Sequence, residues 1–248
     1  MPRHARQKSD SAIYHIILRG INRQQIFEDE EDKDRLIETL QTCKDKSGFR
    51  LFAYCLMGNH FHLLLKVEKE DLELIVKRIA GSYAYWYNLK YRRIGHLFQD
   101  RFKSEAVEDD RYFFAVLRYI HQNPLKAGLC KEIRTYKYSS YGEYIKGHSG
   151  MLEIDYVFSM IDKESFVRFN EEITDIKCFD VENEGARLND SDAMAILQKV
   201  SKCSSASEFQ ALEIAYRDQF LKELRRNGLS IRQISRLTGV SFGIVRKH

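Results

Sequence analysis

Two short apolar runs joined by a two-residue turn constrain the fold of this chain more than any other feature. Phe49–Met57 reads FRLFAYCLM, His60–Val67 reads HFHLLLKV, and Gly58-Asn59 separates them. Each run is shorter than an ordinary helix, and a turn dipeptide between two apolar runs is a strong local signal for a β-hairpin. The centre of the fold is therefore predicted to be a pair of antiparallel strands.

The segments on either side of this hairpin predict alternating strands and helices. Strand-like segments lie at Ser11–Arg19 and 104–108, and helix-like segments lie at 32–46, 72–89 and 110–122. Pro124 is expected to end the last helix, because the residue before a proline disfavours the helical conformation. The order β-α-β-β-α-β, then a helix, is that of the split βαβ, ferredoxin-like fold. We therefore expect an α+β domain with an antiparallel sheet and helices packed on one face.

Charge divides the chain into blocks that the overall net charge of +4 hides. Residues 1–150 carry a net +6, residues 151–184 a net −7 and residues 217–248 a net +6. This division predicts a first domain over 1–148, an acidic connector over 149–190 and a helical region over 191–248. Basic blocks are candidate contacts for a polyanion, although a solvated basic surface explains them equally well.

Composition and patterning exclude several classes of protein. No apolar run approaches the roughly 18 residues that cross a bilayer, and no apolar stretch follows the basic residues at the start. We therefore expect a cytoplasmic protein without a membrane partner. The five cysteines are odd in number and far apart, so neither a disulfide framework nor a cysteine zinc site is expected.

The third predicted strand begins with two histidines separated by one residue, His60-Phe61-His62. Side chains at i and i+2 of a strand point to the same face, so both imidazoles project together while Phe61 points to the opposite face. Two adjacent imidazoles supply half of a divalent metal site. Histidines that hydrogen-bond within the sheet are the alternative, and the pair alone does not decide between them.

A nucleophilic tyrosine on a helix could share a face with a metal ligand four residues later. Among the 14 tyrosines, Tyr119 has Asn123 at that position, and Tyr144 has His148 but with Gly147 between them. The phenol of Tyr119 and the amide of Asn123 would face the same way. Taken alone, the pair is explained as well by an amphipathic core edge and by a helix-terminal asparagine before proline.

Taken together, these residues resemble the single-tyrosine HUH transposases, named for two histidines that flank a hydrophobic residue, and in particular the REP-associated tyrosine transposase branch. Five ordered blocks within roughly residues 11–145 carry the resemblance, which does not extend beyond residue 150. The blocks are Tyr14–Arg23, Ala53–Leu64, Gly95–Lys103, Leu117–Leu129 and Tyr138–Tyr141. Gly58 stands where this branch often has a proline before the asparagine of the turn.

The resemblance implies a metal-dependent transposase or endonuclease that cleaves and rejoins single-stranded DNA at hairpins. Tyr119 would be the nucleophile that forms a 5′-phosphotyrosine, and His60, His62 and Asn123 would hold Mg²⁺ or Mn²⁺. No nucleotide cofactor is implied, because a covalent intermediate conserves the energy of the cleaved bond. The resemblance allows a monomer or a homodimer.

Candidate DNA contacts lie in two parts of the predicted first domain. A basic and aromatic stretch over 87–103 combines charges that neutralise phosphates with rings that stack on unpaired bases, although the rings could equally belong to the core. A second group follows the first predicted strand. The candidate residues are Arg19, Asn22, Arg23, Lys90, Arg92, Arg93, Arg101 and Lys103.

The C-terminal segment Leu229–His248 is typical of a helix-turn-helix, with Thr238-Gly239-Val240 as the turn and Ser241 as a cap for the second helix. A plain helical hairpin is the alternative. A second helix of this kind would enter the major groove of duplex DNA, with Arg232, Arg236 and Arg246 as candidate contacts. This segment is therefore expected to hold the enzyme on duplex DNA.

Two other functions remain open from the sequence. The chain could be a DNA-binding protein that has kept the fold without the chemistry, or a rolling-circle replication initiator that uses the same chemistry. The presence of both histidines, Tyr119 and Asn123 argues against the first. Short length and one candidate tyrosine argue against the second.

Overall fold

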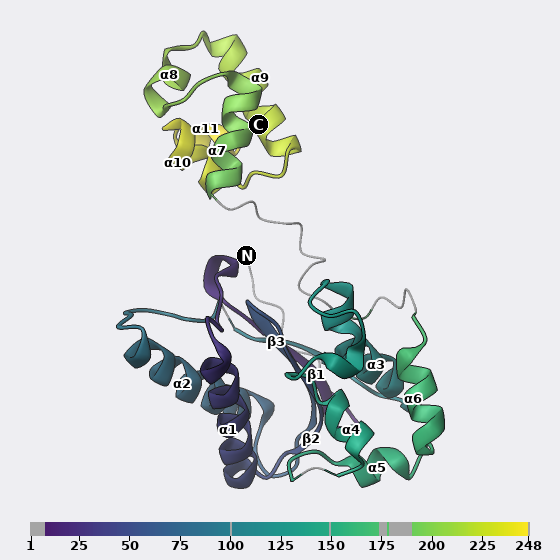
Figure 1. Cartoon of the computed structure of the whole chain (residues 1–248). Coiled ribbons are helices and arrows are strands. Elements are labelled where there is room, and N and C mark those ends of the chain that lie inside the picture. Colours follow the sequence, from purple (N-terminus) through teal and green to yellow (C-terminus); the bar gives the residue numbers. More distant parts are fainter. Residues whose placement is uncertain (1–7, 100, 149, 174–177, 179–189, 248) are drawn as a thin grey trace. The chain divides into compact units, whose positions relative to one another are not determined.

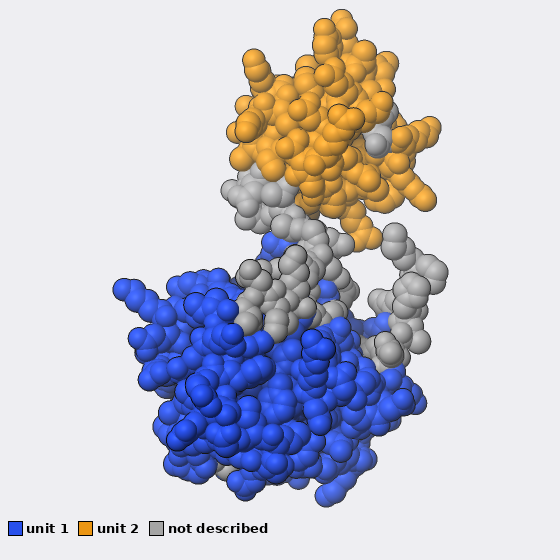
Figure 2. All heavy atoms as spheres, turned by 90° about the vertical axis from the view of Figure 1, so that its right-hand side faces the viewer, with its two compact units in different colours: residues 1–180 blue, residues 181–248 orange. Residues whose placement is uncertain are grey.

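The computed structural model describes residues 8–99, 101–148, 150–173, 178 and 190–247. The chain divides into two compact units, residues 1–180 and 181–248, which are coloured blue and orange in Figure 2. Each unit has its own cluster of buried apolar side chains. Among the described residues, no helix is both long enough and apolar enough to span a bilayer.

The first unit is built on one four-stranded antiparallel sheet. Its strands are β1 (Ile13–Arg19), β2 (Arg50–Leu56), β3 (His60–Lys66) and β4 (Lys103–Ala106), in the spatial order β2-β3-β1-β4. The two central strands are therefore β3 and β1, and the expected hairpin of β2 and β3 is present. The expectation of an α+β fold with a split βαβ sheet is confirmed.

Helices cover both faces of this sheet, and the expectation of helices on one face was wrong. Figure 1 shows α1 (Glu30–Ser47) and α2 (Leu72–Lys90) on one side, with α3 (Asp110–Lys126) and α4 (Tyr141–Lys146) on the other. Phe61 meets Phe98 on the first side, whereas His62 meets Tyr119 of α3 on the second. Residues 61–65 of β3 are all buried, and successive residues of a strand point to opposite faces, so both faces of the sheet are covered here.

Helix α3 continues past Pro124, which the sequence had predicted to be its stop. Proline cannot donate a backbone hydrogen bond to the carbonyl of Ile120, so the helix lacks one bond there and ends two residues later at Lys126. The extra turn keeps Asn123 helical. Its Nδ2 donates to the carbonyl of Tyr119 at 3.2 Å, which orients the amide along the helix.

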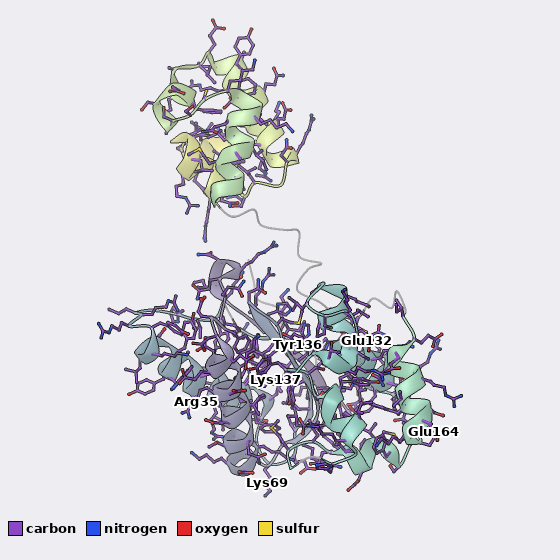
Figure 3. The ribbon with its side chains drawn as sticks, in the orientation of Figure 1. Arg35, Lys69, Glu132, Tyr136, Lys137 and Glu164 are labelled. Carbon is purple, nitrogen blue, oxygen red and sulfur yellow. The ribbon has the colours of Figure 1, made fainter. Side chains whose placement is uncertain are left out.

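The segment after α3 returns to the edge of the sheet through the turn η2 (Ile133–Thr135). Tyr136 and Lys137, labelled in Figure 3, fix this return. The hydroxyl of Tyr136 donates to the carbonyl of Leu56 at 2.7 Å, and Lys137 pairs with Glu30 at 2.9 Å.

Part of the range expected to be an acidic connector, 149–190, is folded against the sheet. It forms α5 (Ile154–Phe158) and α6 (Lys163–Glu171), whose Val157 and Phe166 are fully buried in the core of the first unit. These helices are too short for their periodicity to stand out in an acidic sequence. Residues 174–177 and 179–189 of that range lie outside the described residues.

The second unit is all-helical, as expected. It comprises α7 (Asp190–Ser201), α8 (Ala206–Ala211), α9 (Ile214–Arg226), α10 (Ile231–Thr238) and α11 (Phe242–Val245) around Leu197, Phe209, Leu224 and Ile234. Two separate helices, α8 and α9, follow α7, because the chain leaves helical geometry at Leu212. Ser230 and Gln233 form a capping box at the start of α10, whereas the side chain of Ser241 makes no cap bond to α11.

Candidate active site

The two histidines of β3 lie at the start of a central strand and face α3. Their ring centroids are 5.0 Å apart with the planes at 75°. His62 is fully buried, and His60, next to the turn, is half-buried. The strand geometry predicted from the i, i+2 spacing is therefore present, and one ring of the pair is reachable from solvent.

The ring of Tyr119 closes over these histidines from α3. Its centroid lies 5.8 Å from that of His62, with the planes at 77°, and its side chain is 6% exposed. The Nζ of Lys126, two helical turns further on, lies 5.4 Å from the centroid of the same ring. The fold thus brings together Tyr119 and the histidine pair, which are far apart in sequence. Asn123 lies one turn beyond Tyr119 on the same helix and is 7% exposed.

The neighbouring turn residue fixes which nitrogen of His60 carries its proton. The Nδ2 of Asn59 donates to the carbonyl of Arg23 at 3.1 Å, so its Oδ1 faces the histidine as an acceptor. The Nδ1 of His60 lies 2.7 Å from that oxygen and donates to it. A neutral His60 therefore carries its proton on Nδ1 and presents Nε2 as an electron-pair donor.

A third histidine, His15 of β1, belongs to the same cluster and was missed by the sequence reasoning. Its Nε2 lies 3.0 Å from Nδ1 of His62, and the two rings stack with centroids 5.3 Å apart. Its centroid is also 5.9 Å from that of Tyr119. The available signal was its place in Tyr14–Arg23, one of the family-like blocks, but the contact depends on the pairing of β1 with β3.

The remaining nitrogen of His62 is the clearest sign of a ligand site. Its Nε2 is buried and has no hydrogen-bond partner among the described residues. Burial, followed by the charges of His60 and His15, holds the pKa of His62 well below its usual range, so the ring is neutral at physiological pH. A buried polar atom without a partner costs free energy unless a ligand completes it.

The donor set fits a divalent cation. Two neutral imidazoles and an amide oxygen are ligands of the kind that Mn²⁺ and related cations accept. Within the described residues, no group of three or more His, Cys, Asp and Glu side chains is arranged to hold a metal, so a third ligand from another residue type is needed. Asn123 supplies such a type, because its Nδ2 is held by the helix and its Oδ1 is the remaining acceptor.

Lys90, expected to contact DNA, is instead committed to an ion-pair cluster. Its Nζ lies 2.7 Å from Asp29, 2.9 Å from Glu31 and 2.8 Å from Asp32, whose side chain is fully buried. An ammonium group has three hydrogens to donate, and these partners use all of them. These ion pairs give Lys90 a structural role, which is to fasten the end of α2 to the start of α1, and they compete with the predicted DNA contact.

The other predicted DNA contacts in the first unit are placed as follows. Arg19 ends β1 directly opposite His60. Asn22 and Arg23 lie in the 3₁₀ turn η1 (Ile21–Arg23) with φ of 52° and 61°. Arg93 donates to Gln24 and Asn88 at 3.2 and 3.4 Å. The remaining three are Arg92 and Arg101, both exposed, and Lys103, which starts β4.

In the second unit, Arg232 and Arg236 are exposed on α10, and Arg246 is exposed just after α11. Gly239 makes the turn between these helices in the left-handed conformation, with φ of 69°. The two helices and their turn match the element order of a helix-turn-helix, and α11 spans four residues. The DNA contacts of this segment remain predictions.

Comparison with known proteins identifies similar chains. Residues 8–123 match the family described as "Transposase IS200 like". A curated protein of Haemophilus influenzae, "Putative REP-associated tyrosine transposase", is 27% identical over 118 residues, which cover 43% of this chain and 66% of the relative, just under two thirds of its length.

Among solved structures, a REP-associated tyrosine transposase bound to a REP hairpin aligns with a TM-score of 0.55 and 15% identity. The alignment covers 72% of this chain and 95% of that one. At this identity the likeness shows the fold. The family resemblance inferred from the five sequence blocks is confirmed by the family match and the curated relative.

Proposed function

We propose that this chain, whose residues 8–123 match the family described as "Transposase IS200 like", cleaves and rejoins single-stranded DNA at hairpin sequences. The observation that carries the proposal is the packing of the Tyr119 ring over His62, whose buried Nε2 has no hydrogen-bond partner among the described residues. This arrangement supports the proposal, because a metal-assisted phosphoryl transfer requires a nucleophile beside a ligand site.

Tyr119 is the nucleophile in this proposal. Its phenolic oxygen attacks the phosphorus of a phosphodiester, the new bond joins phosphorus to the tyrosine, and the bond to the 3′-oxygen breaks. The phenol loses its proton, and the 3′-oxygen takes one up. The products are a 5′-phosphotyrosine and a free 3′-hydroxyl, which can reverse the step. A phenol, with a pKa near 10, leaves more readily than an aliphatic alcohol when the strand is rejoined.

His60, His62 and Asn123 are the residues that would hold a divalent cation. The held Nδ1 atoms of both histidines direct Nε2 toward the ligand side, which supports this assignment. Such a cation, when bound, polarises the scissile phosphate as a Lewis acid. The family resemblance favours Mg²⁺ or Mn²⁺, and ligand softness favours Mn²⁺ or Zn²⁺ over Mg²⁺.

Basic residues beside the site are suited to the DNA strand. Arg19 lies opposite His60 at the solvent-accessible end of the pair, and Lys126 lies beside the ring of Tyr119. Both can neutralise phosphates on either side of the scissile bond. A hairpin substrate is proposed by analogy with the solved relative, which was captured on a REP hairpin. A monomer and a homodimer both remain compatible with this function.

The second unit is proposed to bind duplex DNA beside the hairpin. The exposed Arg232 and Arg236 of α10 and Arg246 beyond α11 would contact the duplex if the two helices act as a helix-turn-helix. A catalytically silent DNA-binding protein and a rolling-circle initiator are the competing functions. The first predicts binding without a covalent product, and the second predicts cleavage of plasmid-origin DNA in preference to hairpin repeats.

A covalent-capture experiment tests the chemistry. Full-length protein is mixed with a library of single-stranded stem-loops bearing short flanks, labelled at either the 5′ or the 3′ end, with Mn²⁺ or Mg²⁺ or with a chelator. A 5′-phosphotyrosine requires the 3′-labelled strand to migrate with the protein on denaturing gels and the 5′-labelled fragment to be released. Both products should need the cation.

Variants assign the roles. Tyr119→Phe and His62→Ala should abolish the adduct, whereas Tyr112→Phe, two turns earlier on α3, should keep it. Binding of all hairpins without an adduct would favour the silent DNA-binding protein. An adduct that persists in Tyr119→Phe would show that another tyrosine is the nucleophile.

A further inference from the structure

We propose that His15 is a positioning residue that holds His62 in the one tautomer able to bind a divalent cation. The inference rests on the proposed function, because it concerns the same ligand site. Its basis is the 3.0 Å contact between Nε2 of His15 and Nδ1 of His62, on the side of the His62 ring opposite its unpartnered Nε2.

The sheet fixes the separation of the two rings. In the antiparallel pairing of β1 with β3, His15 lies opposite Leu64 and His62 lies opposite Ile17, so the histidines are diagonal neighbours on one face. Both are fully buried, and their planes are within 21° of each other. The strands hold the two nitrogens at hydrogen-bonding distance, and the ring of Tyr119 from α3 packs against both imidazoles.

One proton lies between these two nitrogens, and its position decides what His62 can do. If Nδ1 of His62 donates to His15, then Nε2 of His62 is unprotonated and has an electron pair for a cation. If His15 donates instead, a neutral His62 carries its proton on Nε2, and that nitrogen cannot ligate a metal. The first arrangement is the proposed one: His15 accepts at an unprotonated Nε2 and carries its own proton on Nδ1.

A histidine in this place differs chemically from the carboxylate that often supports a ligating imidazole. A carboxylate would add a negative charge to the site and offset part of the charge of a bound cation. His15 orients the ring as a neutral group, so the cation keeps more of its charge for the phosphate oxygens. Asn59 supports His60 in the same neutral way. Both proposed imidazole ligands are thus oriented by uncharged acceptors.

Cation binding to the full-length protein, without DNA, tests the inference. Mn²⁺ affinity is measured by electron paramagnetic resonance of the free ion for wild type, His62→Ala, His15→Phe and His15→Gln. His15→Phe keeps a ring of similar size but removes the acceptor, and we expect about 10–100-fold weaker binding. His15→Gln restores an acceptor oxygen, and we expect it to recover part of the loss.

A second measurement needs no variant and reads the tautomer directly. The ¹⁵N chemical shifts of His62 in the cation-free wild-type protein should show a protonated Nδ1 and an unprotonated Nε2. A protonated Nε2 would overturn the inference, even where His15→Phe fails to fold.

The outcomes separate this inference from the proposed function. If His62→Ala removes Mn²⁺ binding but folded His15→Phe binds Mn²⁺ as tightly as wild type, the role of His15 is overturned and the proposed metal site is kept. If wild-type protein does not bind Mn²⁺, or binds it equally well in His62→Ala, the proposed metal site is overturned and this inference with it. Weaker binding in His15→Phe at an unchanged melting temperature would support both, because a purely structural loss would lower the melting temperature.

Discussion

The Nδ1 of His121 lies 2.8 Å from the Oδ1 of Asn170, and this contact ties α6 to the helix that carries Tyr119. Asn170 is held in turn by its Nδ2, which donates to the carbonyl of Phe166. On the other side of the imidazole, the hydroxyl of Ser140 lies 2.9 Å from Nε2. One side of α3 therefore faces the histidines of the sheet, while another is fastened to α6.

Asn170→Leu should weaken this fastening. The variant leaves the buried Nδ1–H of His121 without an acceptor, and an unsatisfied buried donor costs about 1–3 kcal/mol. We expect the first unit to unfold at lower urea concentration and the yield of covalent DNA adduct to fall with it. Glu172→Gln is the control, because Glu172 pairs with Arg118 at 3.6 Å but is 70% exposed. Equal stability of the two variants would contradict the role given to Asn170.

Lys90→Met should destabilise the protein without weakening its DNA binding. Removal of the ammonium leaves the fully buried Asp32 carboxylate without its cation, at a cost of roughly 2–3 kcal/mol, moderated because Lys90 is 20% exposed. The salt dependence of single-stranded DNA binding should be unchanged. In Arg92→Gln, the matched control, stability should be kept and the salt slope reduced. If DNA affinity depends less steeply on salt concentration in Lys90→Met than in wild type, Lys90 does contact DNA phosphate.

The ion pairs of Lys90 should also make the stability of the protein depend on pH. The hydrogen bond from Lys90 is the largest influence on Asp29 and holds the pKa of its carboxyl below the usual range. Its contribution to stability is therefore present above the unfolded-state pKa of about 4 and is lost as the pH falls through the lower folded value. Urea midpoints measured from pH 6 to pH 2.5 should fall less steeply below pH 4 in Lys90→Met than in wild type. Parallel curves would contradict this coupling.

Lys126→Met should slow cleavage more than it weakens DNA binding. The Nζ of Lys126 lies 5.4 Å from the ring centroid of Tyr119, close enough for its charge to favour the phenolate that must form. We expect a rate of adduct formation several-fold lower at saturating DNA, with the loss reduced at high pH. Lys131→Met, which removes an exposed charge beyond the end of α3, is the control. A loss that is independent of pH would limit Lys126 to phosphate binding and exclude an effect on the phenolate.

The elements that could be predicted from the sequence are those set by local pattern. The i, i+2 spacing of His60 and His62 and the i, i+4 spacing of Tyr119 and Asn123 are properties of a single strand and a single helix, and both are present. The continuation of α3 past Pro124 was not predictable from local preference, because residues distant in sequence hold this part of the helix: His121 and Gln122 both bond to Asn170 of α6.

The missed features depend on pairing between distant segments. His15 contacts His62 because β1 lies beside β3, and no spacing within either segment indicates this. Lys90 belongs to a basic stretch, which favours a DNA contact, yet the start of α1 supplies three carboxylates that neutralise it. Charge along the sequence did not indicate these carboxylate partners, since it carries no information about which helix packs alongside.

A substitution at Gly239, in the turn between α10 and α11, should separate duplex DNA binding from DNA cleavage. Gly239 has a φ of 69°, and a Cβ at this position would run into the side chain of Gln210. Gly239→Ala should therefore destabilise the second unit by about 1–2 kcal/mol and weaken binding to a hairpin that carries a duplex flank. Gly243→Ala is the matched control, because a Cβ there meets nothing within 4 Å.

Adduct formation on a hairpin without the duplex flank should be unchanged in both variants, because every proposed catalytic residue lies in the first unit. Unchanged affinity of Gly239→Ala for the flanked hairpin, at a melting temperature that has fallen, would show that α10 and α11 do not hold the duplex. The second unit would then need another function, while the proposed cleavage by Tyr119 would stand.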